Sequence, residues 1–210
     1  MRFDILFLDL DGTLVDSGAD IAASLNWALH REGEPELPEK RIIAAIGGGV
    51  PTLLDRTIGP SHPKRERIHA GLREHYRAHL MDRTTLYPGV RETLESISIP
   101  RVMVTNKPED MSRKLVEGLG IAQLFAAIYG GEGRLPRKPD PASILEALDR
   151  FKASKSRALH VGDSGVDVAT ARAAGIRCCG VTYGYSVPGE LDGADFQIAR
   201  FDELAGILRD

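Results

Sequence analysis

Short apolar segments rich in β-branched residues recur along the chain, and each is separated from the next by helical patterns. The segments are FDILFLDL, PRVMVTN, FAAIYGG, RALHVGDS, IRCCGVTYG and DFQIA. The stretches MSRKLVEGLGI, PASILEALDRF and VDVATARAAGI repeat apolar residues with a period of about 3.6 and are bounded by glycine or proline. Buried strands alternating with helices are typical of a parallel sheet covered on both faces. The pattern therefore predicts a doubly wound α/β fold.

The pattern changes between the first strand and PRVMVTN. From about residue 17 to residue 86 no strand is evident, and the helical periods are IAASLNWALH, EKRIIAAI, VPTLLDRTI and RIHAGLREHYRAHL. An all-helical stretch of this length is too long for one crossover connection and indicates an inserted subdomain. We predict an α/β core formed by residues 1–15 and 87–210 and a helical cap formed by residues 16–86, with LYPGV marking the return to the core.

Composition and charge narrow the classes of function. The 210 residues are 42% hydrophobic and 27% charged, with a net charge of −3, which is typical of a globular protein and gives no basic excess for nucleic acid. No uncharged apolar run approaches the roughly 20 residues of a membrane span, and Asp4 and Asp9 interrupt the first apolar stretch. We expect a cytoplasmic protein without membrane or nucleic-acid partners. Cys178 and Cys179 are adjacent, so we expect buried strand residues rather than a disulfide. The sequence leaves the oligomeric state open.

Polar side chains gather where the predicted strands end. These are Asp9 with Asp11, Thr105 with Asn106, Lys138, and Asp163 with Asp167. Ligands of open parallel sheets bind outside the carboxyl ends of the strands, so we expect these residues to converge. Two carboxylates 4 Å apart repel by about 4 kcal/mol at an effective dielectric of 20, so such a cluster needs compensating charge. Lys138 offsets one carboxylate, and Mg²⁺, which prefers oxygen ligands, offsets two more.

The same residues suit phosphoryl transfer. An ionised carboxylate needs no general base, so Asp9 could attack phosphorus and Asp11 could move protons to the leaving group and from water. Thr105, Asn106 and the backbone N–H groups of the turn after Asp9, with Gly12 among them, could bind phosphoryl oxygens. The small-molecule substrate would then be a phosphomonoester.

The stretches DLDGTLVDS, VTNKP, KPDP and GDSGVD, in this order and with a helical insert after the first, resemble the haloacid dehalogenase superfamily over the whole chain. The resemblance implies a Rossmann-like core with a helical cap, Asp9 as nucleophile and Asp11 as general acid and base. It also implies Mg²⁺ held by Asp9, the backbone carbonyl of Asp11 and Asp163, with support from Asp167. Thr105 and Lys138 match phosphate-contacting positions, with Asn106 as a second donor.

Within the superfamily, IGGGVPTLLDRTIG, LYPGV, TNKPEDM and the GYSVPGEL…ADFQIARFDEL tail are most similar to phosphoglycolate phosphatases. This similarity favours 2-phosphoglycolate as substrate, although related small-molecule phosphatases share these stretches. In the cap, Gly48 and Gly49 of the triple glycine would let backbone approach a small substrate, and Arg56 could contact an anion. The second aspartate of the first motif, Asp11, argues against the dehalogenase branch.

Other interpretations remain at this stage. A phosphomutase of the same superfamily would carry the same residues. A phosphorylatable switch would also cluster aspartates with a lysine, but it has no use for a lid. Asp163 could cap the following helix, Asp167 could complement that helix's dipole, and Lys138 could be a solvated loop charge beside Arg137.

Overall fold

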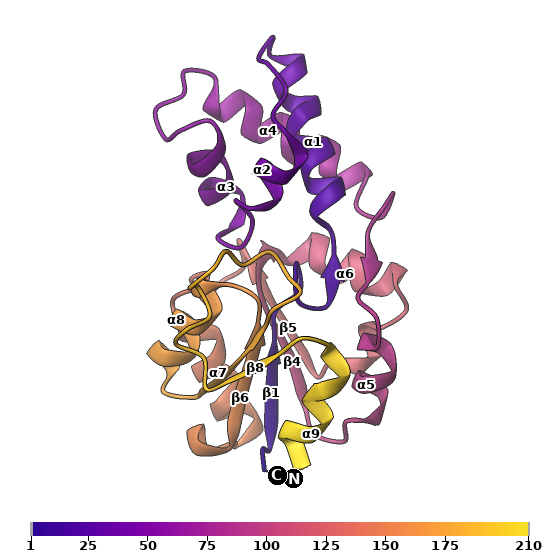
Figure 1. The fold of residues 1–210 in the computed structure, drawn as a ribbon, viewed down its shortest axis with the longest axis vertical. Coiled ribbons are helices and arrows are strands. Elements are labelled where there is room, and N and C mark those ends of the chain that lie inside the picture. Colours follow the sequence, from indigo (N-terminus) through magenta and orange to yellow (C-terminus); the bar gives the residue numbers. More distant parts are fainter. Residues whose placement is uncertain (1, 210) are drawn as a thin grey trace.

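The computed structural model describes residues 2–209, so the predicted core limits at residues 1 and 210 lie outside the described residues. Within this range, one six-stranded sheet has the order β5-β4-β1-β6-β7-β8, and all its pairings are parallel (Figure 1). The strands are β1 (Ile5–Leu8), β4 (Arg101–Pro108), β5 (Ala127–Gly131), β6 (Ala158–Gly162), β7 (Arg177–Val181) and β8 (Phe196–Ile198). Five of them fall inside a predicted segment and β4 runs two residues beyond PRVMVTN, which confirms the parallel sheet.

Helices cover both faces of this sheet. They are α5 (Val90–Ser96), α6 (Glu109–Gly118), α7 (Ala142–Phe151), α8 (Gly165–Ala174) and α9 (Leu204–Arg209), with short 3₁₀ turns at Ala122–Leu124, Lys155–Arg157 and Phe201–Glu203. Leu6 and Leu8 of β1 join a buried cluster with residues of α5, α6 and α9. Ile5 and Phe7, which point to the opposite face, join a second cluster with residues of α7 and α8. The predicted doubly wound α/β fold is therefore confirmed.

Four helices form the inserted cap: α1 (Gly18–Arg31), α2 (Glu39–Ile43), α3 (Gly49–Thr57) and α4 (Arg65–Ala78). In Figure 1 they stand beyond one end of the sheet, over the carboxyl ends of its strands. They have a buried cluster of their own, in which Leu25, Leu54 and Leu72 are almost fully buried. The side chains that this cluster buries come from several helices, so the cap is a packed unit rather than a loose connection.

Two very short strands join the cap to the core. β2 (Val15–Asp16) and β3 (Thr85–Leu86) pair antiparallel where the chain leaves the core and where it returns. The expectation that no strand lies between about residue 17 and residue 86 was wrong at β3, because a two-residue strand is too short to show a period of two. Asp20 in the first turn of α1 accepts backbone hydrogen bonds from Arg83 and Thr84, which ties the two connections together. No helix within residues 2–209 is long and apolar enough to cross a membrane.

Candidate active site

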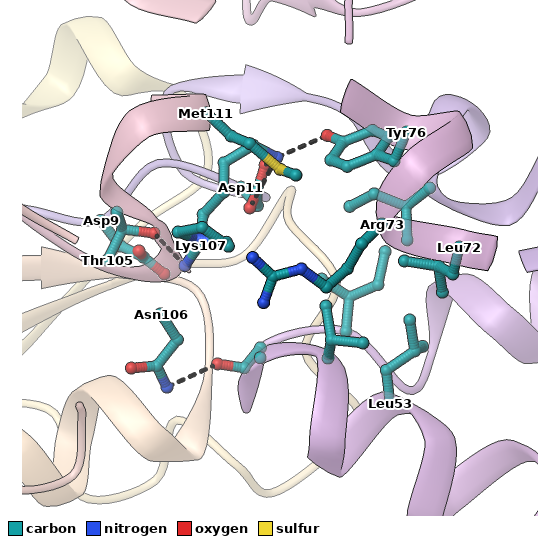
Figure 2. A pocket seen from close by; sticks show the side chains of 16 residues that line it. Asp9, Asp11, Leu53, Leu72, Arg73, Tyr76, Thr105, Asn106, Lys107 and Met111 are labelled. Atoms are coloured by element: carbon teal, nitrogen blue, oxygen red, sulfur yellow. Dashed lines mark hydrogen bonds and ion pairs between the residues drawn. The ribbon is translucent and has the colours of Figure 1, made fainter. Parts of the chain in front are cut away.

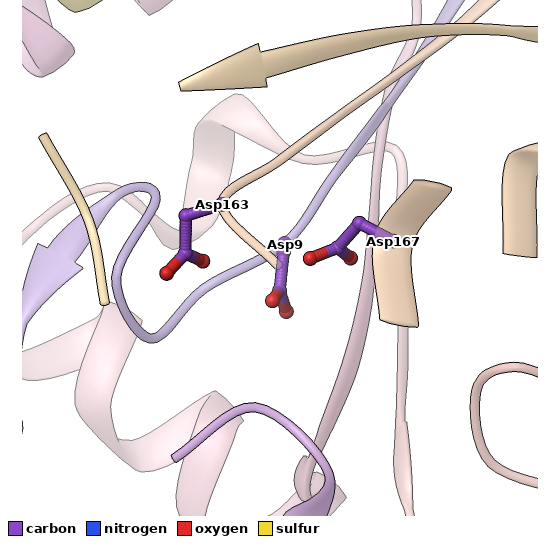
Figure 3. Close-up of side chains that lie close together, drawn as sticks. All are labelled: Asp9, Asp163 and Asp167. Atoms are coloured by element: carbon purple, nitrogen blue, oxygen red, sulfur yellow. The ribbon is translucent and has the colours of Figure 1, made fainter. Parts of the chain in front are cut away.

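Three buried aspartates meet at the carboxyl ends of neighbouring strands. Asp9 follows β1, while Asp163 and Asp167 follow β6, and each offers a carboxylate oxygen within 4.8 Å of the others (Figure 3). Lys138 lies 2.9 Å from Asp9 and 2.6 Å from Asp167, measured from its Nζ to a carboxylate oxygen of each. The Lys138 side chain is 1% exposed, so it is not a solvated loop charge. The predicted convergence of these residues is present.

The Asp167 carboxylate accepts hydrogen bonds from several donors and so fixes the arrangement of the side chains around it. One of its oxygens accepts from Lys138 Nζ and His160 Nε2, and the other accepts from the backbone N–H and hydroxyl of Ser164. Ser164 is the N-cap of α8 and forms a capping box with Asp167, so the alternative that Asp163 caps this helix was wrong. Burial acts to raise the pKa of Asp167, but Lys138 and His160 hold that pKa below its ordinary value.

The pKa values of Asp9 and Asp163 are shifted upward, opposite to that of Asp167. Burial raises the pKa of Asp9 to about 7, against the attraction of Lys138, and Asp167 raises it further. Burial also raises the pKa of Asp163 well above its ordinary value, with Asp167 and Asp9 contributing. Asp163 accepts only two hydrogen bonds from the described residues, from Thr13 Oγ1 at 3.0 Å and from the Tyr185 N–H at 2.7 Å. Burial without sufficient counter-charge therefore disfavours the ionised form of both carboxylates.

The donor set fits a hard divalent cation. Three ionised carboxylates beside one lysine leave two negative charges, which a divalent cation would neutralise. The oxygens of Asp167 are already occupied by donors, so Asp9 and Asp163 are the better ligands and Asp167 orients the cluster. Oxygen ligands in a small site are typical of Mg²⁺.

The carboxylate of Asp11 lies apart from this cluster. Its two oxygens accept from Lys107 Nζ at 2.9 and 3.2 Å, and the Ser17 hydroxyl donates to it at 2.6 Å. Lys107 also donates to the hydroxyl of Tyr76, which comes from α4 of the cap. Burial acts to lower the pKa of Lys107, but Asp11 and Tyr76 hold it above its ordinary value. The two aspartates of DLDGT thus have separate cationic partners.

One cavity lies between the core and the cap, and Figure 2 shows the side chains around it. Asp9, Asp11, Thr105, Asn106 and Lys107 line its core side. The cap contributes apolar side chains together with backbone and polar groups: Ile21, Ile46, Gly47, Gly49, Val50, Leu53, Leu72, Arg73 and Tyr76. The Asn106 amide donates to the carbonyls of Gly47 and Lys138, which links the glycine loop of the cap to the core. A substrate bound in this cavity would contact both the glycine loop of the cap and the core.

Some predicted contacts lie elsewhere. The N–H of Gly12 donates to the Val15 carbonyl at 2.9 Å, so this structure gives no support for phosphate binding by Gly12, and that role stays a prediction. The role of Gly12 is steric, because it has φ +82 and an added Cβ would lie 2.2 Å from Asp163. Gly49 lines the cavity, whereas Gly48 is the N-cap of α3 and does not. Arg56 is exposed and outside the lining, and so the structure does not support it as an anion contact.

Sequence reasoning missed four residues of this region. Lys107 lies within the TNKPEDM stretch directly after Thr105 and Asn106, so its place at a strand end was a usable signal. His160 lies inside the buried strand β6, and nothing in the sequence indicated that it would contact the site. Arg73 and Tyr76 share one face of α4, but their approach to the core depends on how the cap packs. Spacing along a helix does not give that information.

Comparisons with known proteins agree with this arrangement. A family model described as haloacid dehalogenase-like hydrolase matches residues 5–181. A phosphoglycolate phosphatase of Chromobacterium violaceum is 37% identical over 210 residues, which cover 96% of this chain and 94% of that protein. A phosphoglycolate phosphatase of Pectobacterium atrosepticum is 32% identical, with 97% and 91% covered.

Solved structures give the same result. A crystal structure described as a predicted phosphoglycolate phosphatase from Haemophilus somnus superposes with a TM-score of 0.92 at 30% identity, covering 99% of this chain and 98% of that one. A predicted phosphatase from Clostridium acetobutylicum has a TM-score of 0.88 at 26% identity, with 99% of each chain covered. The family model, the near full-length relatives and the shared fold show that this chain belongs to the haloacid dehalogenase-like hydrolases.

Proposed function

We propose that this phosphoric monoester hydrolase cleaves a small phosphomonoester through a phosphoaspartyl intermediate on Asp9, and that 2-phosphoglycolate is its substrate. The observation that carries the proposal is the pair of aspartates from one turn, which face one cavity but sit in different surroundings. Asp9 lies with Lys138 and the other buried aspartates, and Asp11 is held by Lys107 and Ser17. Two carboxylates with different partners can take different chemical roles.

The first half-reaction transfers the phosphoryl group. A carboxylate oxygen of Asp9 forms a bond to phosphorus while the bond from phosphorus to the ester oxygen breaks. Asp11, which must carry a proton for this step, gives that proton to the leaving alkoxide, and the alcohol departs. The Asp11 carboxylate that remains is the form that pairs with Lys107. Thr105 lines the same cavity, and its hydroxyl supplies a donor for a phosphoryl oxygen. Asn106 also lines the cavity, but its amide donates to the Gly47 and Lys138 carbonyls, so it would have to exchange one of these bonds to bind a second oxygen. The product of this step is an acyl phosphate on Asp9.

The second half-reaction regenerates the enzyme. Asp11, now ionised, takes a proton from a water molecule, and the resulting hydroxide attacks phosphorus. The bond between phosphorus and Asp9 breaks, so inorganic phosphate leaves and the Asp9 carboxylate is restored. Lys107 and Ser17 keep the Asp11 carboxylate oriented during both steps. The apolar cap side chains exclude bulk water from the cavity and disfavour large substrates.

We also propose that the cofactor is Mg²⁺. Asp9, Asp163 and the backbone carbonyl of Asp11 would hold it, and Asp167 would orient these ligands. When bound, the cation would neutralise charge on the phosphoryl oxygens, in addition to the charge that Lys138 supplies. Burial without sufficient counter-charge at Asp9 and Asp163 supports this assignment.

The test is release of inorganic phosphate from a panel of phosphomonoesters that includes 2-phosphoglycolate, ethyl phosphate and hexose phosphates. We expect release from 2-phosphoglycolate with Mg²⁺, loss of release with chelator, and loss in Asp9→Asn. Conversion of a sugar 1-phosphate to the 6-phosphate without net phosphate release would instead identify a phosphomutase. Stable phosphorylation of the folded protein without turnover would identify a switch.

A further inference from the structure

The cavity contains a cation that the proposed chemistry does not use. Two cationic side chains are among the described residues that line it, Lys107 and Arg73. Lys107 is committed to Asp11 and Tyr76, and its side chain is 2% exposed. Arg73 comes from α4 of the cap, and its side chain is 30% exposed. Figure 2 shows its guanidinium extending from the cap into the cavity, toward the space between Lys107 and Asn106.

The partner of Arg73 leaves it available to a ligand. Arg73 Nη1 forms an ion pair with Glu132, which follows β5 in the core and is 45% exposed on its side chain. Ion pairs at such exposure contribute little free energy, because water competes for both charges. A guanidinium has several N–H donors in one plane, so Arg73 can bind a carboxylate or phosphate by two parallel hydrogen bonds. An anionic group in the cavity would therefore compete well with Glu132.

Among the described residues on the cap side of the cavity, Arg73 is the one with a charged side chain. The other side chains there are mostly apolar, among them Ile21, Ile46, Val50 and Leu53. A substrate whose phosphoryl group lies at Asp9 would direct its other end toward these residues and Arg73. An uncharged or apolar tail would leave Arg73 without a ligand partner, whereas a short anionic tail would pair with it.

We infer that Arg73 is the specificity-determining residue of this site and selects phosphomonoesters that carry a second anionic group, a carboxylate above all, at the end opposite the phosphate. This inference rests on the proposed function for the position of the phosphoryl group. It replaces Arg56 with Arg73 as the anion contact of the cap. A short phosphorylated carboxylic acid such as 2-phosphoglycolate has the required chemistry.

The kinetic test compares substrates that differ in the tail. The measured quantity is the ratio of kcat/KM for 2-phosphoglycolate to kcat/KM for ethyl phosphate. We expect Arg73→Gln to lower this ratio roughly 10- to 100-fold, as for loss of hydrogen bonds to a charged group. Arg73→Lys should restore part of the ratio, because it keeps the charge but not the fork geometry. Glu132→Gln is the matched control, since it breaks the same ion pair, and it should leave the ratio unchanged or raise it.

A binding test separates this inference from the proposed function. Calorimetry with Mg²⁺ measures the affinity of 3-phosphonopropionate, which has a carboxylate tail, and of propylphosphonate, which does not; neither compound is hydrolysed. The wild type should prefer the first roughly 10- to 100-fold, and Arg73→Gln should remove the preference. The same result in a protein that releases no phosphate would overturn the proposed function but support the anion subsite. The subsite would be overturned if Arg73→Gln weakened binding of both phosphonates equally. It would also be overturned if Glu132→Gln removed the preference for 3-phosphonopropionate as Arg73→Gln does.

Discussion

Replacement of Lys107 by methionine tests whether the part of the site around Asp11 depends on a buried ion pair. Lys107 Nζ lies 2.9 Å from Asp11, and the two side chains are only 2% and 13% exposed. Two unit charges at that distance attract by about 6 kcal/mol at an effective dielectric of 20. Desolvation of both groups removes much of this gain, which leaves about 2–3 kcal/mol, as for hydrogen bonds to charged groups.

Lys107→Met should cost more than that net value. It leaves Asp11 with the Ser17 hydroxyl and removes a donor from the Tyr76 hydroxyl. Removal of one partner of a buried pair costs about 3–5 kcal/mol, because the other charge stays buried without compensation. For a chain of this length, each kcal/mol lowers the Tm by roughly 2–4 °C, so the fall is about 6–20 °C.

A double-mutant cycle measures the pair itself. The free energy of unfolding in urea is determined for the wild type, Lys107→Met, Asp11→Asn and the double variant, and we expect a coupling of about 2 kcal/mol. The exposed pair of Arg157 and Asp4 is the control and should couple more weakly. Effects of Lys107→Met and Asp11→Asn that add within about 0.5 kcal/mol would refute the reasoning.

Four further predictions concern the buried cluster. Lys138→Met should destabilise the fold by about 3–5 kcal/mol in urea and abolish phosphate release, since Asp9 and Asp167 lose their shared cation. Mg²⁺ at 100-fold excess over its dissociation constant should stabilise the fold by about 2.7 kcal/mol in calorimetry. Burial raises the pKa of Asp9 to about 7, so without metal the protonated Asp9 side chain contributes its full stability below pH about 4, and this contribution is lost as the pH rises through 7. The rise in Tm that Mg²⁺ causes should therefore be larger at pH 8 than at pH 6. Gly12→Ala should weaken Mg²⁺ binding roughly 10- to 100-fold by titration calorimetry, because its Cβ would displace Asp163.

The sheet and the aspartate cluster were predictable because their signals are local. Strands such as Ile5–Leu8 are buried on both faces, so they appear as continuous apolar runs, and the rule for parallel sheets then brings their carboxyl ends together. Asp9, Lys138, Asp163 and Asp167 needed no further information. Cys178 and Cys179 are buried in β7, as their apolar context indicated.

The cap side of the site was not predictable to the same depth. Arg56 and Arg73 both lie on amphipathic helices, and only the packing of α3 and α4 decides that Arg73 enters the cavity and Arg56 does not. The Gly12 N–H is used inside its own turn, which depends on backbone geometry rather than residue type. Helix α5 has only seven residues, too few for its period to be recognised.

The central claim is that Asp9 carries the phosphoryl group during turnover. The most direct measurement is a rapid-quench reaction with 2-phosphoglycolate labelled in its phosphate, followed by digestion and peptide mapping. We predict transient label on the peptide that contains Asp9, disappearance of the label as phosphate is released, and no label in Asp9→Asn. Phosphate release by the wild type without label on that peptide, or full turnover by Asp9→Asn, would contradict the account.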